Sequence, residues 1–275
     1  MFLSGLGLRQ RLSEDRICRF VVMRLWGAVR RVDSRLLKGG RRLVAIGDTN
    51  FSFHRRGWET VDLVDADYLC DLRVAPLPFA DGSVDAVYSS HMIEHIPRNA
   101  GLRLLREVHR CLKTGATCRL ATPDMDRVLG RYNDGDWSFF LRNGGRLVFD
   151  RVCKGALAPE ALLIHNRLIG WFASYSGRVD TGGGPLTDRA TVDEQLAVLS
   201  KYDFRDWCVS LLEPGRAYAH VHLYDYQELS ESMRKAGFGD VRREEYGSSA
   251  CPAMRDPPID REEHREYSLY VEATR

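Results

Sequence analysis

The sequence predicts an α/β fold, a doubly wound and mostly parallel sheet that is closed by an antiparallel hairpin at its C-terminal end. Three observations support this prediction. Short apolar runs alternate with helical patterns from residue 42 onward, which indicates a sheet covered by helices. The run 84–89 is typical of a buried strand of a parallel sheet. Two extended segments, 241–246 and 267–274, end the chain, and the second alternates between its faces as a strand does.

The elements of this fold follow one another in a definite order. Leu105, Val108 and Leu112 recur at helical spacing, and Lys113-Thr114-Gly115 ends that helix. Only fifteen positions separate Gly47 from Asp62, so the first crossover helix must be truncated. Residues 125–225 lack steady periodicity, and we expect them to form an insertion or lid with helices. We expect strands over 43–46, 60–63, 68–72, 84–89 and 117–121, and helices over 98–112 and 226–236.

Residues 1–41 are predicted to be a basic N-terminal helical arm, and residues 42–275 the main domain. Residues 1–42 contain eleven Lys or Arg and three acids, a net charge near +8 against a remainder near −6. Phe20 and Trp26 lie among these arginines. Such a helix either packs on the main domain or lies on an anionic membrane surface. Both alternatives stay open, in preference to nucleic acid, which the acidic remainder would repel.

Cysteine usage and hydropathy indicate the compartment. The seven cysteines are scattered without a CxxC pair or zinc-ligand spacing, which fits a reducing cytosol and predicts no metal site. No stretch approaches the roughly 18 apolar residues that span a bilayer, and the first residues lack the apolar core of a signal peptide. We therefore expect a cytoplasmic protein, with peripheral membrane contact through residues 1–42 as one alternative. The sequence does not indicate an oligomeric state.

A central block of the chain resembles a known family of enzymes. Residues 77–96, LPFADGSVDAVYSSHMIEHI, followed by Arg106-Glu107-Val108 and Leu112-Lys113-Thr114-Gly115, are similar to the central block of class I S-adenosylmethionine-dependent methyltransferases of the type 11 group. Gly57-Trp58-Glu59-Thr60-Val61-Asp62 resembles a segment of a small bacterial branch with a shortened glycine loop. The resemblance covers about residues 42–275 and leaves out the arm.

The resemblance implies S-adenosylmethionine as the cofactor. In the family, the backbone of a glycine turn approaches the methionine part, and an acid after the second strand accepts hydrogen bonds from the ribose hydroxyls. Asp62 matches that acid. An acid followed by an apolar residue after the third strand contacts the adenine, and polar residues after the fourth strand face the crevice. The residues expected to bind the cofactor are Gly47, Asp48, Asp62, Asp71, Leu72, Ser89 and Ser90.

The resemblance also implies methyl transfer, for which a nearby base removes a proton from a hydroxyl or amine acceptor. His91, directly after the fourth strand, and His220, beside the insertion, are the candidate catalytic residues. The expected acceptor is a small-molecule or glycan-type metabolite of a biosynthetic pathway, with no specific binding of nucleic acid.

A departure from the family leaves a second hypothesis open. The family has Gly-x-Gly where this chain has Gly47-Asp48-Thr49, and Thr49 brings a β-branched side chain to a place that favours bare backbone. The alternative is therefore a methyltransferase-like protein without cofactor binding, which serves as a scaffold or partner protein, with association at a membrane surface as one option. Nicotinamide-dependent redox chemistry is disfavoured, because the dinucleotide glycine fingerprint is absent.

Overall fold

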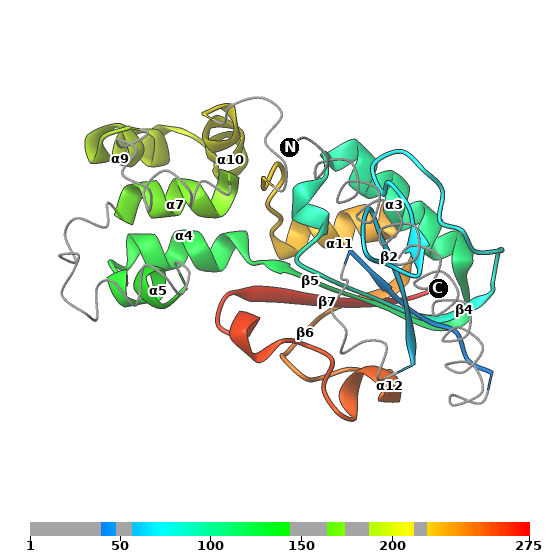
Figure 1. The fold of residues 1–275 in the computed structure, drawn as a ribbon. Helices are drawn as coiled ribbons and strands as arrows, with labels where there is room; N and C mark the ends of the chain where they lie inside the picture. The colour runs from blue at the N-terminus through cyan, green and yellow to red at the C-terminus, as the bar shows by residue number, and fades with distance from the viewer. Residues whose placement is uncertain (1–39, 48–56, 144–163, 174–186, 212–218) are drawn as a thin grey trace, which may run out of the picture.

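A seven-stranded sheet forms the centre of the protein (Figure 1). The computed structural model describes residues 40–47, 57–143, 164–173, 187–211 and 219–275. The strand order is β3-β2-β1-β4-β5-β7-β6; neighbouring strands from β3 to β5 are parallel, and β7 is antiparallel to both β5 and β6. The strands are β1 (Leu43–Ile46), β2 (Trp58–Asp62), β3 (Tyr68–Leu69), β4 (Val84–Ser90), β5 (Leu112–Pro123), β6 (Gly239–Glu244) and β7 (Ser268–Thr274).

The predicted fold class is confirmed, and the strands differ from prediction mainly in length. β3 is two residues long instead of five, because the chain turns where Val74 N–H and Ala75 N–H donate to the Asp71 carbonyl. β5 starts at Leu112, five residues before the predicted strand. Gly115 N–H in its first part donates to the carbonyl of Arg275, so the pairing of β5 with β7 extends to the last residue of the chain. The truncated first crossover falls on residues 48–56, which lie outside the described residues.

Among the described residues, two helices cover one face of the sheet. They are α3 (Arg98–Cys111) and α11 (Tyr226–Lys235), close to the predicted helices. Leu105 and Val108 of α3 and Leu229 and Met233 of α11 are buried against Val87 and its neighbours in one large apolar core. This burial is the main favourable contribution to the stability of the sheet.

The C-terminal segment covers part of the other face. Trp58 and Tyr88 are buried there with Met254 of α12 (Pro252–Arg255). Arg119 of β5 is fully buried, and its Nε and Nη2 donate to the Asp260 carboxylate at 3.0 and 2.6 Å. A buried charge needs such a partner, so this pair ties the segment before η3 (Glu262–His264) to the sheet.

The insertion forms a helical layer of its own beyond the end of β5 (Figure 1). Its helices share a separate apolar core that includes Phe139, Phe172 and Phe204. A bridge between Asp124 and Tyr224 closes the insertion at its base. The helices are α4 (Met125–Asn133), α5 (Trp137–Arg142), α7 (Ile164–Ala173), α9 (Arg189–Val198) and α10 (Lys201–Ser210).

Within the part of the chain that the structure describes, none of the helices is both long and apolar enough to cross a bilayer. The basic arm lies outside the described residues.

Candidate active site

The strand order places a ligand site at one edge of the sheet. The chain moves outward from β1 to β2 and β3 on one side and from β4 to β5 on the other. In open α/β sheets, ligands bind at the carboxyl ends of the strands where the order reverses. Here that point lies between β1 and β4, so the residues that follow Ile46 and Ser90 are the first to consider.

The register brings the ends of these strands together. Ile46 pairs with both Val61 of β2 and Ser89 of β4, and Gly47 N–H donates to the Val61 carbonyl at 2.8 Å. Asp62 pairs with Leu69 of β3. The predicted residues Gly47, Asp62, Asp71 and Ser90 therefore follow one edge of the sheet. Asp48 and Thr49, the other residues of the predicted Gly47-Asp48-Thr49 turn, lie outside the described residues.

Gly47 is in a conformation and a position that favour glycine. Its φ is +71°, and a Cβ atom built on it would lie 2.0 Å from Met92 Cγ and 2.5 Å from Met92 Cβ. Because those atoms are at the start of the Met92 side chain, they could move aside only at a high energetic cost. The chain therefore leaves β1 with its backbone closely covered by the segment that follows β4.

The two acids of the predicted cofactor site have different surroundings. Asp62 is half-buried, and its Oδ1 accepts a hydrogen bond from Leu63 N–H at 2.5 Å. Asp71 accepts bonds from Arg73 Nε and Nη2 at 2.9 and 2.8 Å. These bonds, with a third from the Arg73 backbone, lower the pKa of Asp71 to about 2. Asp71 is therefore ionised and already paired with Arg73.

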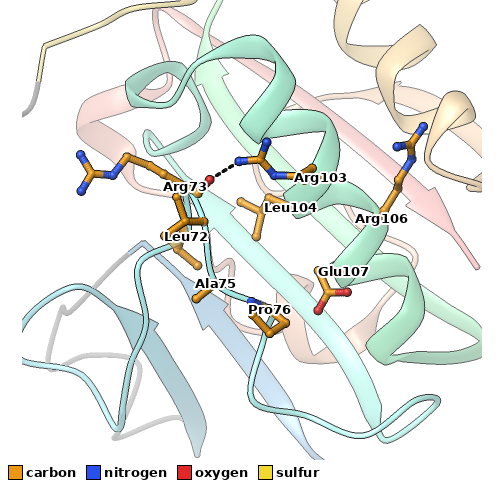
Figure 2. A pocket seen from close by; sticks show the side chains of 9 residues that line it. Leu72, Arg73, Ala75, Pro76, Arg103, Leu104, Arg106 and Glu107 are labelled. Atoms are coloured by element: carbon orange, nitrogen blue, oxygen red, sulfur yellow. Dashed lines mark hydrogen bonds between the residues drawn. The ribbon is translucent and has the colours of Figure 1, made fainter.

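Leu72 and Ser89 have local structural roles that the sequence did not reveal. Leu72 packs against the main core and lines a cavity of about 300 Å³ between residues 72–76 and α3 (Figure 2). Ser89 Oγ donates to the Ile46 carbonyl at 2.9 Å, so it holds the end of β1. The side chain of Ser90 is buried.

His91 lies at the carboxyl end of β4 in a hydrogen-bonded chain. Its φ is +51°, which is uncommon for a residue other than glycine. Its Nε2 lies 2.7 Å from Ser268 Oγ, and its Nδ1 lies 3.4 Å from Glu94 Oε1. The ring of His264 lies 4.0 Å away between centroids. Glu94 belongs to η1 (Ile93–His95), the short turn that follows β4.

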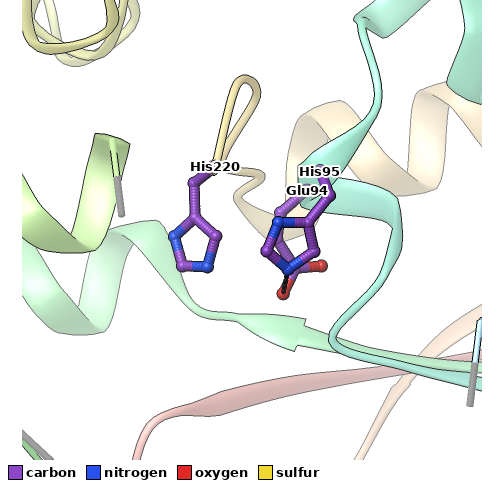
Figure 3. Close-up of side chains that lie close together, drawn as sticks. All are labelled: Glu94, His95 and His220. Carbon is purple, nitrogen blue, oxygen red and sulfur yellow. Dashed lines mark ion pairs between the residues drawn. The ribbon is translucent and has the colours of Figure 1, made fainter. Parts of the chain in front are cut away.

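His220 joins the same cluster from the other end of the insertion. Its ring centroid lies 4.8 Å from that of His95, and its Nδ1 lies 2.5 Å from the Trp171 carbonyl of α7. Burial lowers the pKa of His220 to about 4, although the Glu94 carboxylate acts to raise it. His220 is therefore neutral near pH 7. The donor atoms of Glu94, His95 and His220 lie within 4.8 Å of one another, a group that could hold a metal ion (Figure 3).

Glu94 is the ionised centre of this cluster. Burial acts to raise the pKa of the Glu94 carboxyl, but His91, His220 and His95 face it and lower the pKa to about 2. Burial and the neighbouring His91 lower the pKa of His264 to about 3. The structure thus adds Glu94, His95, His264 and Ser268 to the two predicted histidines. The Glu94-His95 pair next to His91 was the only sequence signal for them, since Ser268 is 177 positions from His91.

The sheet order and the polar edge at its reversal point define a class I methyltransferase-like α/β fold. Residues 48–120 match the family model described as "Methyltransferase domain". This match supports the class I methyltransferase superfamily, a methyltransferase as the enzyme class and S-adenosylmethionine as the cofactor.

Several solved structures are similar to this chain. The S-adenosylmethionine-dependent methyltransferase SibL in its apo form is 12% identical, with a TM-score of 0.39 over 86% of this chain and 50% of that chain. A methyltransferase dependent on the same cofactor from Mesorhizobium loti is 15% identical, with a TM-score of 0.39 over 85% and 90%. One from Archaeoglobus fulgidus is 12% identical, with a TM-score of 0.40 over 92% and 94%.

This chain thus spans half the length of the SibL chain. No curated protein matches the sequence.

Proposed function

We propose that this protein transfers the methyl group of S-adenosylmethionine to a small-molecule or glycan-type acceptor in a biosynthetic pathway. One observation carries the proposal: Gly47, Asp62 and His91 lie at the carboxyl ends of three neighbouring strands, β1, β2 and β4, on both sides of the point where the strand order reverses. These are a tightly covered glycine, a carboxylate and a histidine, the groups that hold a charged nucleoside and take a proton.

The residues at the ends of β2 and β3 fit the nucleoside part of the cofactor. Asp62 offers carboxylate oxygens for ribose hydroxyls, the strongest kind of acceptor for such donors. Of the six large hydrophobic side chains that are exposed among the described residues, four fall between positions 63 and 74: Leu63, Val64, Leu69 and Val74. A concentration of exposed apolar side chains marks a binding surface, and its place beside two acids suits a purine ring with its amino group.

Gly47 and Asp62 would hold S-adenosylmethionine. The bound cofactor would supply a methyl group on a sulfonium sulfur to an acceptor oxygen or nitrogen, and the electron pair of the C–S bond would remain on sulfur. His91 is placed to accept the proton that the acceptor loses. Its Nδ1 faces the ionised Glu94, so the proton of the neutral ring resides on Nδ1 and Nε2 is the basic nitrogen. The acceptor would then replace Ser268 Oγ at His91 Nε2.

Of the two predicted catalytic histidines, His91 suits a general base better than His220. A base works best when its pKa lies near the working pH, and the pKa of His220 is only about 4. Tyr267 and Trp171, whose rings lie 4.8 Å apart beside this cluster, supply the apolar and polar surface that a small hydroxylated acceptor requires.

We further infer a cytoplasmic location. Cys70, Cys111, Cys118 and Cys208 are free and buried, which suits a reducing compartment. Contact of the basic arm with a membrane belongs to the same proposal.

Calorimetric titration with S-adenosylmethionine and S-adenosylhomocysteine tests the cofactor site. We expect micromolar binding that Asp62→Ala weakens at least tenfold, because a charge-assisted hydrogen bond is worth about 1.5 to 3 kcal/mol. Asp134→Ala is the matched control, since Asp134 is exposed on the insertion, away from the sheet edge. A folded protein that binds neither compound would support the scaffold alternative instead.

A screen of hydroxylated and amine-bearing metabolites, read out by the release of S-adenosylhomocysteine, tests the acceptor. On any acceptor found, His91→Asn should lower turnover by about 10² to 10⁴-fold with little change in cofactor affinity. His109→Asn serves as the control, because His109 lies at the end of α3 near the opposite edge of the sheet. Equal losses in both variants would count against His91 as the base.

A further inference from the structure

The cluster that follows β4 contains a carboxylate and two imidazoles from distant parts of the chain. Glu94 and His95 belong to η1, and His220 precedes α11. One donor atom from each lies within 4.8 Å of the other two (Figure 3). We propose that Glu94, His95 and His220 bind a divalent transition-metal ion, with zinc as the first candidate.

Both imidazoles are oriented for metal binding by the backbone. His95 Nδ1 lies 3.1 Å from the Ala219 carbonyl, and His220 Nδ1 lies 2.5 Å from the Trp171 carbonyl. A carbonyl only accepts, so each Nδ1 carries the proton and each Nε2 carries the lone pair. This arrangement, a ring N–H donated to a backbone carbonyl, is the usual outer-shell contact of metal-binding histidines. His95 Nε2 faces Glu94 Oε1 at 3.9 Å.

The backbone also fixes the two halves of the site against each other. Val221 N–H and His222 N–H both donate to the Glu94 carbonyl, at 2.8 and 3.1 Å. Thr122 Oγ1 donates to Glu94 Oε2 at 3.2 Å. Glu94 Oε2 is thus held by β5, and Oε1 is directed toward the histidines. The three ligands are therefore positioned before any ion binds, which lowers the entropic cost of binding.

The donor set favours zinc-like ions over magnesium or calcium. Two imidazoles and a carboxylate form the ligand set of zinc sites that keep a fourth position open, whereas magnesium and calcium take oxygen ligands. Bonds of about 2.0 to 2.1 Å at tetrahedral angles place ligand atoms about 3.3 Å apart. The 3.9 Å between Glu94 Oε1 and His95 Nε2 requires a closure of about 0.6 Å, and the widest pair, which is within 4.8 Å, requires a closure of up to about 1.5 Å. An ion there would also compensate the charge of Glu94, which is 0% exposed.

The ion would lie beside His91, since His91 Nδ1 is 3.4 Å from the same Glu94 oxygen. A divalent ion with an open position lowers the pKa of a hydroxyl group that coordinates it. If the proposed methyl transfer holds, on which this step rests, the acceptor class narrows to molecules that present an oxygen atom. The binding of the ion itself does not depend on that function.

Zinc binding to the full chain tests the inference. Chelator-treated protein is mixed with zinc in the presence of a competing chromophoric chelator, and zinc retained after gel filtration is measured by elemental analysis. We expect one zinc per chain. His220→Ala, His95→Ala and Glu94→Gln should each weaken zinc binding more than about 100-fold, because losing a ligand costs more than losing an outer-shell partner. His109→Ala, which removes a histidine outside the cluster, should retain it.

Two further measurements separate the outcomes. Circular dichroism confirms that each variant is folded, and the near-isosteric Glu94→Gln provides the result if an alanine variant fails to fold. Retention of stoichiometric zinc by the folded cluster variants, or no retention by the wild type, would overturn the inference. Cofactor titration of the metal-free protein is a separate result: zinc binding without cofactor binding leaves the metal site standing and defeats the methyltransferase proposal.

Discussion

At the scale of single residues, Gly47 determines how the chain enters the site. The sequence predicted a glycine turn here, and the structure supplies two separate reasons for it. One is the φ of +71°, and the other is the Met92 side chain that occupies the space of a Cβ atom. The positive φ can be predicted from the sequence, because a glycine directly after a strand is typical of such a turn. The second reason cannot, because Met92 is brought there only by the pairing of β1 with β4.

These two reasons predict the effect of Gly47→Ala. A positive φ costs a residue with a Cβ about 1 to 2 kcal/mol, and overpacking costs about 1 to 3 kcal/mol more. We expect the free energy of unfolding, measured in urea, to fall by about 3 kcal/mol. Gly115→Ala is the matched control, since Gly115 has a φ of +75° but no atom within 4 Å of its Cβ position. It should lose only about 1 to 2 kcal/mol; equal losses would mean that Met92 yields.

The side chains of the histidine cluster show where prediction from the sequence stops. His91 was predicted from its place after the fourth strand, and that place is confirmed by the end of β4 at Ser90. The sequence predicted no metal site, because only cysteine spacing was informative there. Glu94 and His95 are adjacent in the sequence. His220 lies next to them only because the insertion folds back and returns the chain to the end of β4. Sequence spacing carries no signal for a contact that depends on tertiary structure over 125 positions.

At the scale of elements, helices with one buried face could be predicted and others could not. α3 was predicted nearly to its ends, because Leu105 and Val108 face the sheet while solvent covers the opposite side. α7 lies inside the insertion and buries His165, Asn166 and Arg167 as well as its apolar residues. A helix buried around most of its circumference has no single apolar stripe, so residues 164–173 gave no helical pattern.

The junction of α10 and α11 depends on one buried carboxylate. Asp225 caps α11 by accepting from Glu228 N–H at 2.7 Å. It also lies 2.6 Å from Lys201 Nζ and accepts from Tyr202 Oη at 2.8 Å, both in α10. Burial acts to raise the pKa of Asp225, but these partners more than offset it, so the pKa is lowered. The ionised carboxylate therefore joins the insertion to the main domain.

This lowered pKa predicts acid sensitivity. The pKa of Asp225 is lower in the folded chain than the value of about 3.9 for an ordinary aspartate in an unfolded chain. The contribution of Asp225 to the free energy of unfolding is therefore complete above about pH 3.9. It is lost as the pH falls through the folded pKa. Urea unfolding from pH 6 down to pH 3 should show the free energy of unfolding declining below about pH 4. Asp225→Asn should start lower and decline less; parallel curves for the two proteins would exclude Asp225 as a source of the decline.

At the scale of the whole molecule, charge is divided between two regions. Residues 1–42 carry a net charge near +8, and the remainder carries near −6. The sequence leaves two roles for the arm: attachment to the acidic domain, or contact with an anionic membrane. The two roles differ in whether anionic lipid is needed, since salt weakens the attraction of the arm to an acidic domain as well as to a membrane. Attraction between the arm and a membrane weakens as ions screen it, within about 10 Å at 0.1 M salt.

Vesicle sedimentation of the full chain separates these roles. On vesicles that contain phosphatidylserine, each basic residue near the surface contributes about 1 kcal/mol. Replacing Arg16, Arg19, Arg24, Arg30 and Arg31 by glutamine should therefore weaken binding by more than about 10³-fold. Vesicles of phosphatidylcholine alone are the control for apolar contact. If the wild type binds neither kind of vesicle while the substitutions lower its thermal stability, the arm is attached to the acidic domain. Binding that is equal on both vesicles and insensitive to salt would contradict the electrostatic basis of membrane contact, leaving Phe20 and Trp26 as its source.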